Sequence, residues 1–336
     1  MNSMKKNIPI FVTHYGCPNQ CVFCNQKKIS GAQSAFDFQE CEALLKKASK
    51  MNYPPENTEV AFFGGSFTGI PLAVQKQYLS LAQKYRDYFH GIRISTRPDY
   101  ISEAILDLLA EYGVTTIELG VQSMIDEVLR KNQRGMTQED TLTAVNLIRS
   151  YPFSLGLQMM VSMYGSTPAD DLKTAEQIVA LKPDFVRIYP TVVLEDTKLY
   201  TLYQEGKYQT KSLEETVTLT AQIYRKFVDA KIPVIRVGLM ASDEINSKTV
   251  IGAYHEAFGE LVQNEVYFQL LTEALTEKET KGKRLLIHCG EKALSKVAGQ
   301  KRKNLLRLYE IYQFRDIKLI PENQTADFWL SLEVES

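Results

Sequence analysis

The sequence predicts an α/β fold in which a partial (β/α)6 TIM-like barrel is followed by a small α+β C-terminal extension. Short β-rich runs alternate with segments of helical periodicity, a pattern typical of βαβ units and a parallel sheet. Three cysteines directly follow the first β-rich run, and barrels carry their reactive groups on the loops after strands. An open parallel sheet of the doubly wound type fits the same alternation and remains the alternative.

Six β-rich runs are the predicted strands of the barrel. They lie at residues 8–13, 59–63, 92–96, 116–121, 155–161 and 185–189. Helices are predicted between them because apolar residues recur at helical spacing, as they do over 38–48 and over 101–109, where Gly113 follows as a helix terminator. Residues 137–148 and 168–181 predict two further helices. Six strand–helix repeats make about three quarters of an eightfold barrel.

The predicted boundary between the two parts lies near residue 245. A polar, tyrosine-rich stretch over 191–210 precedes a helix at 213–230 and a strand at 234–239, which complete a barrel domain of residues 1–245. The pattern then changes over residues 246–336. Within this extension, residues 281–307 hold nine lysines and arginines against one acid, Glu291.

Length and composition describe an ordinary globular protein that stays in the cell. The chain has 336 residues, 44% of them hydrophobic and 24% charged, and a net charge of −1. This balance predicts no global attraction to nucleic acid or to a membrane, so any such attraction is local. No apolar run approaches the ~18 residues that span a bilayer, and no secretory signal is recognisable. Five sparse cysteines argue against a disulfide framework, so we expect a cytoplasmic protein.

Cys17, Cys21 and Cys24 are the most informative residues, with the spacing Cys-x3-Cys-x2-Cys. Three thiolates on one short loop can hold three corners of a 4Fe-4S cluster, which normally takes four, so one iron stays open to a small molecule. A structural zinc site is the alternative, but it uses four ligands. Only His14 stands nearby as a fourth ligand, since the remaining two cysteines lie far along the chain. A zinc- and RNA-binding protein without catalytic activity therefore remains a second hypothesis.

At this spacing the chain resembles radical-SAM enzymes, and the resemblance implies that S-adenosylmethionine (SAM) occupies the open iron. An aromatic residue before the last cysteine, here Phe23, can cover the cluster and flank the adenine. Gly64, Gly65 and Ser66 follow the second predicted strand. They resemble the glycine turn that receives the methionine amino group of SAM in this superfamily.

Two further blocks resemble oxygen-independent coproporphyrinogen oxidase and its relatives. The run Gly120-Val121-Gln122-Ser123 is followed by Arg134 in the pattern Asn-x-Arg. This resemblance implies that Gln122 and Arg134 contact SAM and that Gln158 contacts the ribose. Ser95 ends the third predicted strand, from which a polar side chain can also reach the ribose.

The chain also resembles the radical-SAM half of the Elongator catalytic subunit. The matching blocks are residues 95–99, 118–123, 134–135 and 189–191, and the similarity covers roughly residues 10–240. That family attacks the wobble uridine of tRNA with a 5′-deoxyadenosyl radical and acetyl-CoA. Here the first cysteine gap is shorter, and the chain ends at Ser336, so we expect no acetyltransferase domain. The chain resembles the short, stand-alone Elongator-like bacterial proteins.

The resemblance predicts the function. A cluster electron cleaves SAM, and the 5′-deoxyadenosyl radical abstracts hydrogen from the substrate, for which an RNA base in tRNA is favoured. An electron donor of the flavodoxin or ferredoxin type is then a partner. A small-molecule substrate, as in coproporphyrinogen oxidase, is the alternative. The sequence assigns no residue to the chemistry on the substrate; Tyr164, Tyr189 and Tyr200 fit a substrate pocket or core packing equally.

The C-terminal extension contains a predicted RNA contact. A strand (284–289), a helix (291–297), a basic turn (299–304), a second helix (305–312) and a strand (317–320) follow one another. Helix, glycine-started basic turn and helix is the order with which KH modules clamp an RNA backbone, although the second glycine of their loop is absent. The predicted RNA-binding residues are Lys296, Lys301, Arg302 and Lys303; a solvated basic face is the alternative.

Overall fold

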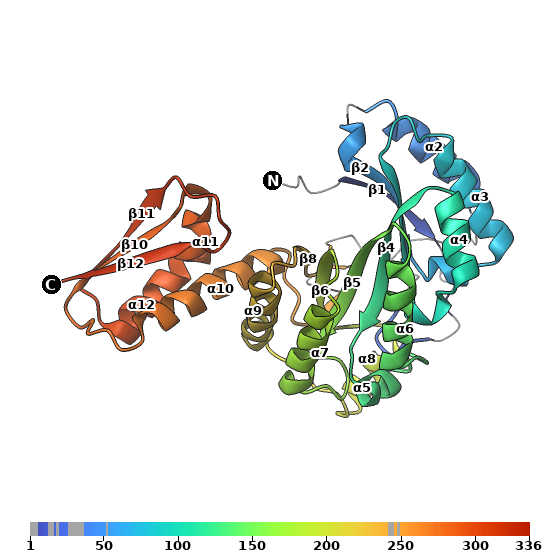
Figure 1. Cartoon of the computed structure of the whole chain (residues 1–336). Helices are drawn as coiled ribbons and strands as arrows, with labels where there is room; N and C mark the ends of the chain where they lie inside the picture. Colours follow the sequence, from blue (N-terminus) through green and yellow to red (C-terminus); the bar gives the residue numbers. More distant parts are fainter. Residues whose placement is uncertain are drawn as a thin grey trace. The chain divides into compact units, whose positions relative to one another are not determined.

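The computed structural model describes residues 6–12, 17, 20–25, 37–51, 53–240, 245–246 and 249–336. The chain forms two compact units (Figure 1). The first lies within residues 1–212 and 226–256, and the second within residues 213–225 and 257–336. None of the helices in the described part of the chain combines the length and apolarity needed to cross a bilayer.

A parallel sheet of seven strands forms the first unit, and its strand order follows the chain. The order is β1 (Lys6–Val12), β2 (Thr58–Gly64), β3 (Gly91–Thr96), β4 (Val114–Gln122), β5 (Ser154–Val161), β6 (Phe185–Pro190) and β8 (Val234–Val237). Every neighbouring pair is parallel. A doubly wound sheet would reverse its strand order, and this sheet does not. The structure therefore confirms the partial barrel. A seventh strand, β8, follows the six strands on which the prediction was based.

Helices lie between and after the strands. They are α2 (Phe38–Ala48), α3 (Leu72–Gln83), α4 (Glu103–Glu111), α5 (Asp126–Lys131), α6 (Gln138–Arg149), α7 (Pro168–Ala180), α8 (Lys198–Gln204) and α9 (Leu213–Asp229). Figure 1 shows α4, α6 and α7 along one face of the sheet. The starts of α6 and α7 are fixed by capping boxes, in which Thr137 pairs with Asp140 and Thr167 with Asp170. Local chemistry thus sets where the loops after β4 and β5 end.

Buried charges occupy the interior of the barrel. The guanidinium of Arg93 binds Glu59 at 2.7 Å and also Glu118, and Arg187 binds Glu118 at 2.8 Å. Hydroxyl groups complete the network, since Thr116 donates to Glu59 at 2.7 Å. Buried charges are tolerated when they are paired and hydrogen-bonded in this way. The network ties β2, β3, β4 and β6 together on the side away from the helices.

The stretch predicted as a polar break contains structure of its own. β7 (Val192–Leu194) pairs antiparallel with β9 (Val250–Gly252), and α8 follows β7. This pairing places residues up to 256 in the first unit, beyond the boundary expected near residue 245. Helix α9 contributes to both units, because its residues up to Arg225 group with the second.

The second unit is a small α+β structure around its own apolar core. It contains α10 (Phe258–Leu275), β10 (Arg284–Gly290), α11 (Leu294–Ala298), α12 (Lys303–Tyr312), β11 (Asp316–Glu322) and β12 (Leu330–Glu335). The sheet has the order β11-β10-β12, with β10 parallel to β11 and antiparallel to β12. Leu271, Ile287, Val297 and Leu308 are fully buried in the core between helices and sheet. The strand, helix, turn, helix and strand expected over 284–320 are present in that order.

Candidate cofactor site at the cysteine loop

The cysteine loop follows β1, at the carboxyl ends of the parallel strands. Cys21 is buried, and Cys17 and Cys24 are half-buried. Backbone hydrogen bonds fix the loop between two helices. The amide of Val22 donates to the carbonyl of Asn132 at 3.1 Å, just past α5, and its own carbonyl accepts from the amide of Leu199 in α8 at 2.8 Å. The three thiols therefore sit on a loop that the barrel holds from two sides.

An apolar cluster anchors the cysteine loop through Val22. Val22 is 1% exposed and is buried with Val193, Leu199 and Tyr208. Phe23 packs against this cluster, together with Tyr164 and Tyr200 among others. The structure places Phe23 between Val22 and Cys24 on the supported loop, and its predicted contact with a cofactor stays a prediction.

The glycine turn after β2 approaches both β1 and the first cysteine. Gly64 has φ = +108°, and a Cβ built on it would collide with the carbonyl oxygen of Val12, so only glycine fits without a shift. The backbone amide of Ser66 donates to the Cys17 thiol. The Ser66 hydroxyl lies 2.7 Å from that of Thr96. The turn thus brings Ser66 beside Cys17, and the predicted contact of Gly64, Gly65 and Ser66 with SAM stays a prediction.

The end of β4 is irregular where two predicted residues lie. A bulge between Gly120 and Gln122 interrupts the pairing of β4 with β5, and Gln122 has φ = +68°. The Gln158 amide of β5 donates to the Gln122 side chain at 3.2 Å. Strained positions of this kind concentrate at functional sites. Ser95 is half-buried and pairs with Glu118 on the neighbouring strand; its predicted ribose contact stays a prediction.

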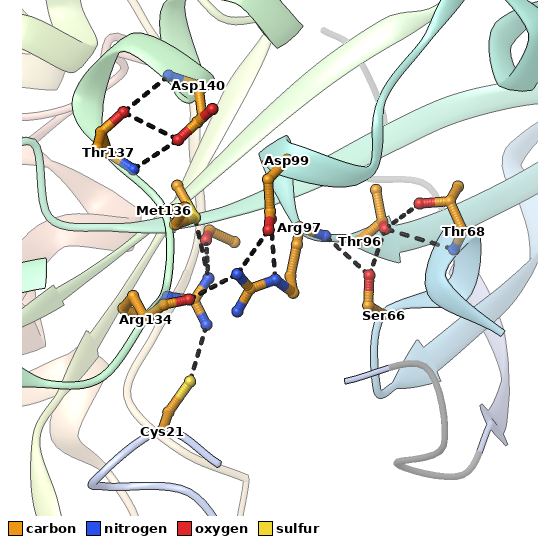
Figure 2. Close-up of polar contacts among 11 residues, drawn as sticks. Cys21, Ser66, Thr68, Thr96, Arg97, Asp99, Arg134, Met136, Thr137 and Asp140 are labelled. Atoms are coloured by element: carbon orange, nitrogen blue, oxygen red, sulfur yellow. Dashed lines mark hydrogen bonds and ion pairs between the residues drawn. The ribbon is translucent and has the colours of Figure 1, made fainter. Parts of the chain in front are cut away.

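Arg134 reaches from the loop before α6 to the cysteines (Figure 2). Its Nη1 donates to the Cys21 sulfur at 3.2 Å, and its Nη2 donates to the Gly120 carbonyl at 2.6 Å and lies 3.7 Å from the Met136 sulfur. The residue is 6% exposed. The structure therefore brings together Cys21, the β4 end and Arg134, which lie far apart in the sequence.

The electrostatics of Cys17 reflect both burial and this surrounding. Burial raises the pKa of the Cys17 thiol, and the neighbouring Cys21 raises it further. The hydrogen bond from the Ser66 amide and the charges of Arg97 and Arg134 act in the opposite direction and lower it. Since the thiolate is the form that binds metal, amides and guanidinium groups around the sulfur favour ligation. The donor set fits an iron–sulfur cluster: three cysteine sulfurs on one loop, with cationic donors beside them.

The zinc alternative needs four ligands around one ion, and the side-chain positions do not separate it from a cluster site. Within the described part of the chain, no three His, Cys, Asp or Glu side chains are placed to hold one metal ion. His14, the fourth ligand of the zinc alternative, lies outside the described residues.

Two residues of this network received no role from the sequence. The Thr96 hydroxyl is hydrogen-bonded to the hydroxyls of Ser66 and Thr68. The Arg97 guanidinium donates to the Asp99 carboxylate and to the backbone carbonyl of Arg134. Their position at the end of the third predicted strand, from which polar side chains can reach a ribose, is the sequence signal that points to them. Apart from Asp99, their partners come from distant segments of the chain, so the sequence did not reveal these contacts.

The predicted RNA-binding residues belong to the second unit. Lys296 is half-buried on α11, whereas Lys301, Arg302 and Lys303 are exposed. Lys301 and Arg302 have φ of +53° and +61°, and Lys303 begins α12 with an ion pair to Glu214 at 3.0 Å. The turn they form is structurally defined, and its contact with RNA stays a prediction.

Comparisons with known proteins agree with this geometry. Residues 11–178 match the family model of the Radical SAM superfamily, and residues 183–267 match that of the Radical_SAM C-terminal domain. The tRNA uridine(34) acetyltransferase of Methanocaldococcus jannaschii is 27% identical over an alignment of 288 positions that covers 73% of this chain and 52% of that protein. Human Elongator complex protein 3 is 25% identical over an alignment of 245 positions that covers 60% of this chain and 43% of that protein.

The chain thus spans about half the length of the curated relatives it matches. Among solved structures, Elp3 of Methanocaldococcus infernus with an N-terminal deletion superposes with a TM-score of 0.61 at 24% identity. The superposition covers 81% of this chain and 64% of that one. This likeness concerns the fold.

Proposed function

Because the chain belongs to the radical SAM superfamily, we propose that it is an enzyme in which Cys17, Cys21 and Cys24 hold a 4Fe-4S cluster with SAM at the open iron. The observation that carries the proposal is the fixed cysteine loop, with the Arg134 guanidinium on Cys21 and the Ser66 amide on Cys17. When bound and reduced, the cluster supplies the electron that cleaves SAM and starts hydrogen abstraction from the substrate.

The residues around the loop orient and enclose the cofactor. The turn at Gly64 and Gly65 offers backbone within close approach of a ligand, since neither residue carries a side chain. Gln122, at the end of β4, and Gln158, within β5, present neighbouring amide groups, and a ribose has two hydroxyls that such groups can bind. Arg134 fixes a positive charge on the cysteine side of the site. The apolar cluster that includes Val22 anchors the loop to the first unit.

For the substrate we propose an RNA base, in tRNA. Two features support this choice. The curated relatives described above are named as acting on tRNA uridine or as Elongator proteins. In the second unit, Lys301, Arg302 and Lys303 present three exposed cations on one turn between two helices, where a phosphate backbone can be neutralised. The proposal concerns the radical step on the base, and a reductant of the flavodoxin or ferredoxin class in the cytoplasm supplies the electron.

An anaerobic assay tests this function. The protein is reconstituted with iron and sulfide, reduced with dithionite, given SAM, and analysed for 5′-deoxyadenosine with and without bulk tRNA. Formation of the product at a rate that rises with tRNA is the expected result. Mass spectrometry of the tRNA nucleosides then identifies the changed base.

Other outcomes separate the parts of the proposal. Product formation that ignores tRNA would keep the radical chemistry and reject RNA in favour of a small molecule. A colourless protein with one zinc per chain would reject the enzyme and favour the metal- and RNA-binding alternative. A full cluster that never cleaves SAM would contradict the catalytic proposal itself.

A further inference from the structure

Arg97 is a buried arginine at the end of β3 that joins three segments of the cofactor site. Its side chain is 4% exposed. Nε and Nη2 bind the two carboxylate oxygens of Asp99 at 2.9 and 2.8 Å, and Nη2 also donates to the backbone carbonyl of Arg134 at 2.6 Å. The Arg97 amide donates to the Ser66 hydroxyl at 3.2 Å. One residue thus connects the glycine turn, the β3 end and the loop that carries Arg134.

The third nitrogen of this guanidinium is buried and lacks a hydrogen-bond partner among the described residues. Because Asp99 occupies the edge formed by Nε and Nη2, the remaining Nη1 points away from Asp99, as Figure 2 shows. Leaving a buried donor unsatisfied is unfavourable, and more so when the donor is charged. Buried polar atoms in native proteins are nearly always satisfied, and an acceptor on a ligand in the cofactor site would satisfy this one.

Besides Asp99, two cysteines lie near enough to Arg97 to interact with its charge. Burial lowers the pKa of Arg97, but the hydrogen bond and charge of Asp99, followed by the charges of Cys21 and Cys17, raise it above its ordinary value. The interaction is mutual, because Arg97 in turn lowers the pKa of Cys17. Arg97 therefore carries its charge within electrostatic reach of two of the three cysteines.

We infer that Arg97 is a positioning residue of the cofactor site: its fixed positive charge makes the cysteine-bound cluster easier to reduce, and its bond to the Arg134 carbonyl keeps Arg134 against Cys21. The inference rests on the proposed function. Reduction adds a negative charge to a cluster that three thiolates already make negative. A nearby cation stabilises the reduced form, and reduction potentials of such clusters follow net charge, hydrogen bonds to sulfur and exposure.

Asp99 makes it possible to distinguish an electrostatic role of Arg97 from a purely structural one. Its carboxylate offsets the charge of Arg97 from the far edge of the guanidinium and is 21% exposed, against 4% for Arg97. Removing the Arg97 charge makes the site more negative, whereas removing the Asp99 charge makes it more positive. The two neutralising substitutions, Arg97→Gln and Asp99→Asn, are therefore expected to move the cluster potential in opposite directions.

The test is a redox titration of the reconstituted full-length protein without SAM, followed by electron paramagnetic resonance. We expect Arg97→Gln to lower the midpoint potential by about 59 mV or more, a tenfold change in the ratio of reduced to oxidised cluster for one electron. Asp99→Asn is expected to raise the potential. Arg97→Lys keeps the charge and is expected to stay closer to the wild type than Arg97→Gln. Arg130→Gln removes an exposed guanidinium that pairs with Glu127 and serves as the matched control with no shift.

Iron content separates the outcomes. If every variant carries a full cluster and the potentials of Arg97→Gln and Asp99→Asn equal that of the wild type, or move in the same direction, the inference is overturned. If Arg97→Gln fails to fold, Asp99→Asn decides, because it leaves the guanidinium in place and only an upward shift supports the inference. A wild-type protein that takes up no cluster would overturn the proposed function, and the inference with it.

Discussion

The cysteine site of the first unit and the basic turn of the second unit both concentrate positive charge, but they hold it in different ways. Arg97 and Arg134 are 4% and 6% exposed, and hydrogen bonds from several segments fix their guanidinium groups. Lys301 and Arg302 are exposed on a turn whose backbone is in the left-handed region. Fixed buried charge suits one small ligand in one geometry, whereas solvated charge suits a polymer backbone that tolerates small shifts. Substitutions at the two sites should therefore fail in different ways.

The largest expected effect is at the cysteines. Cys24→Ala is expected to reduce the iron content from about four per chain to a small fraction and to abolish 5′-deoxyadenosine formation, because the loop cannot supply another thiolate. Iron and sulfide analysis with the anaerobic assay measures this. Cys41→Ala, a buried cysteine of α2, is the matched control and keeps the cluster. Equal iron in both variants would contradict the ligand assignment.

The next largest effect concerns the close backbone contact at Gly64 in the first unit. Gly64→Ala places a Cβ against the Val12 carbonyl at φ = +108°, so we expect a loss of about 3 kcal/mol or more in the free energy of unfolding. Gly113→Ala is the control, since its φ is +71° but nothing lies within 4 Å of the new Cβ. We expect a cost of about 1 kcal/mol there. Urea unfolding of both variants measures the difference, and equal costs would refute the close approach.

A buried carboxyl group makes the stability of the first unit depend on pH. Burial raises the pKa of Asp171 to about 6, although its oxygens accept from the Ser166 hydroxyl and the Ser162 amide. A raised carboxyl pKa means that the folded state holds the proton more tightly than the unfolded state. The free energy of unfolding should therefore fall by about 2–3 kcal/mol as pH rises from about 4 to 6.

Asp171→Asn does not titrate and isolates this contribution. Its free energy of unfolding, followed by urea titration across that pH range, should lack the fall assigned to Asp171. The same slope in variant and wild type would show that Asp171 titrates at its ordinary pKa.

The smallest effect on stability belongs to the basic turn. Lys301→Gly removes a cation and relieves a left-handed backbone, so we expect stability within about 0.5–1 kcal/mol of the wild type. Affinity for tRNA should nevertheless fall, and the dependence of log Kd on log salt should become less steep by about one unit for each phosphate that the turn no longer neutralises. Filter binding at several salt concentrations measures both. Lys318→Ala, an exposed lysine of β11, is the control; an equal loss of affinity there would make the turn an ordinary solvated face.

The parts of this molecule that were predictable are those with a local signal. The sixth strand was expected at 185–189 and is Phe185–Pro190, because a short apolar run between polar segments marks a buried strand. The cysteine loop and the glycine turn carry their residue types at fixed spacing. By contrast, α10 was not expected, because consecutive residues such as Val266, Tyr267 and Phe268 are all buried, and a helix apolar on several sides gives no clear period.

What the sequence could not supply is the pairing of residues from distant strands. Glu59, Arg93 and Glu118 each read as an isolated charge within a β-rich run, and only the barrel turns them into one network. Arg97 likewise stands in a recognisable block, but its contacts with Ser66 and Arg134 come from other segments. A buried charge is predictable from sequence only when its partner is also close in sequence.

The central claim is that the cysteine loop holds a cluster with one iron open to SAM, and spectroscopy of the bound complex tests it most directly. The reduced, reconstituted protein is examined by electron–nuclear double resonance after addition of SAM labelled with ¹⁵N at its amino group. The account predicts that SAM changes the cluster spectrum and that the ¹⁵N nucleus couples to it. A full cluster whose spectrum SAM leaves unchanged, with no nitrogen coupling, would contradict it.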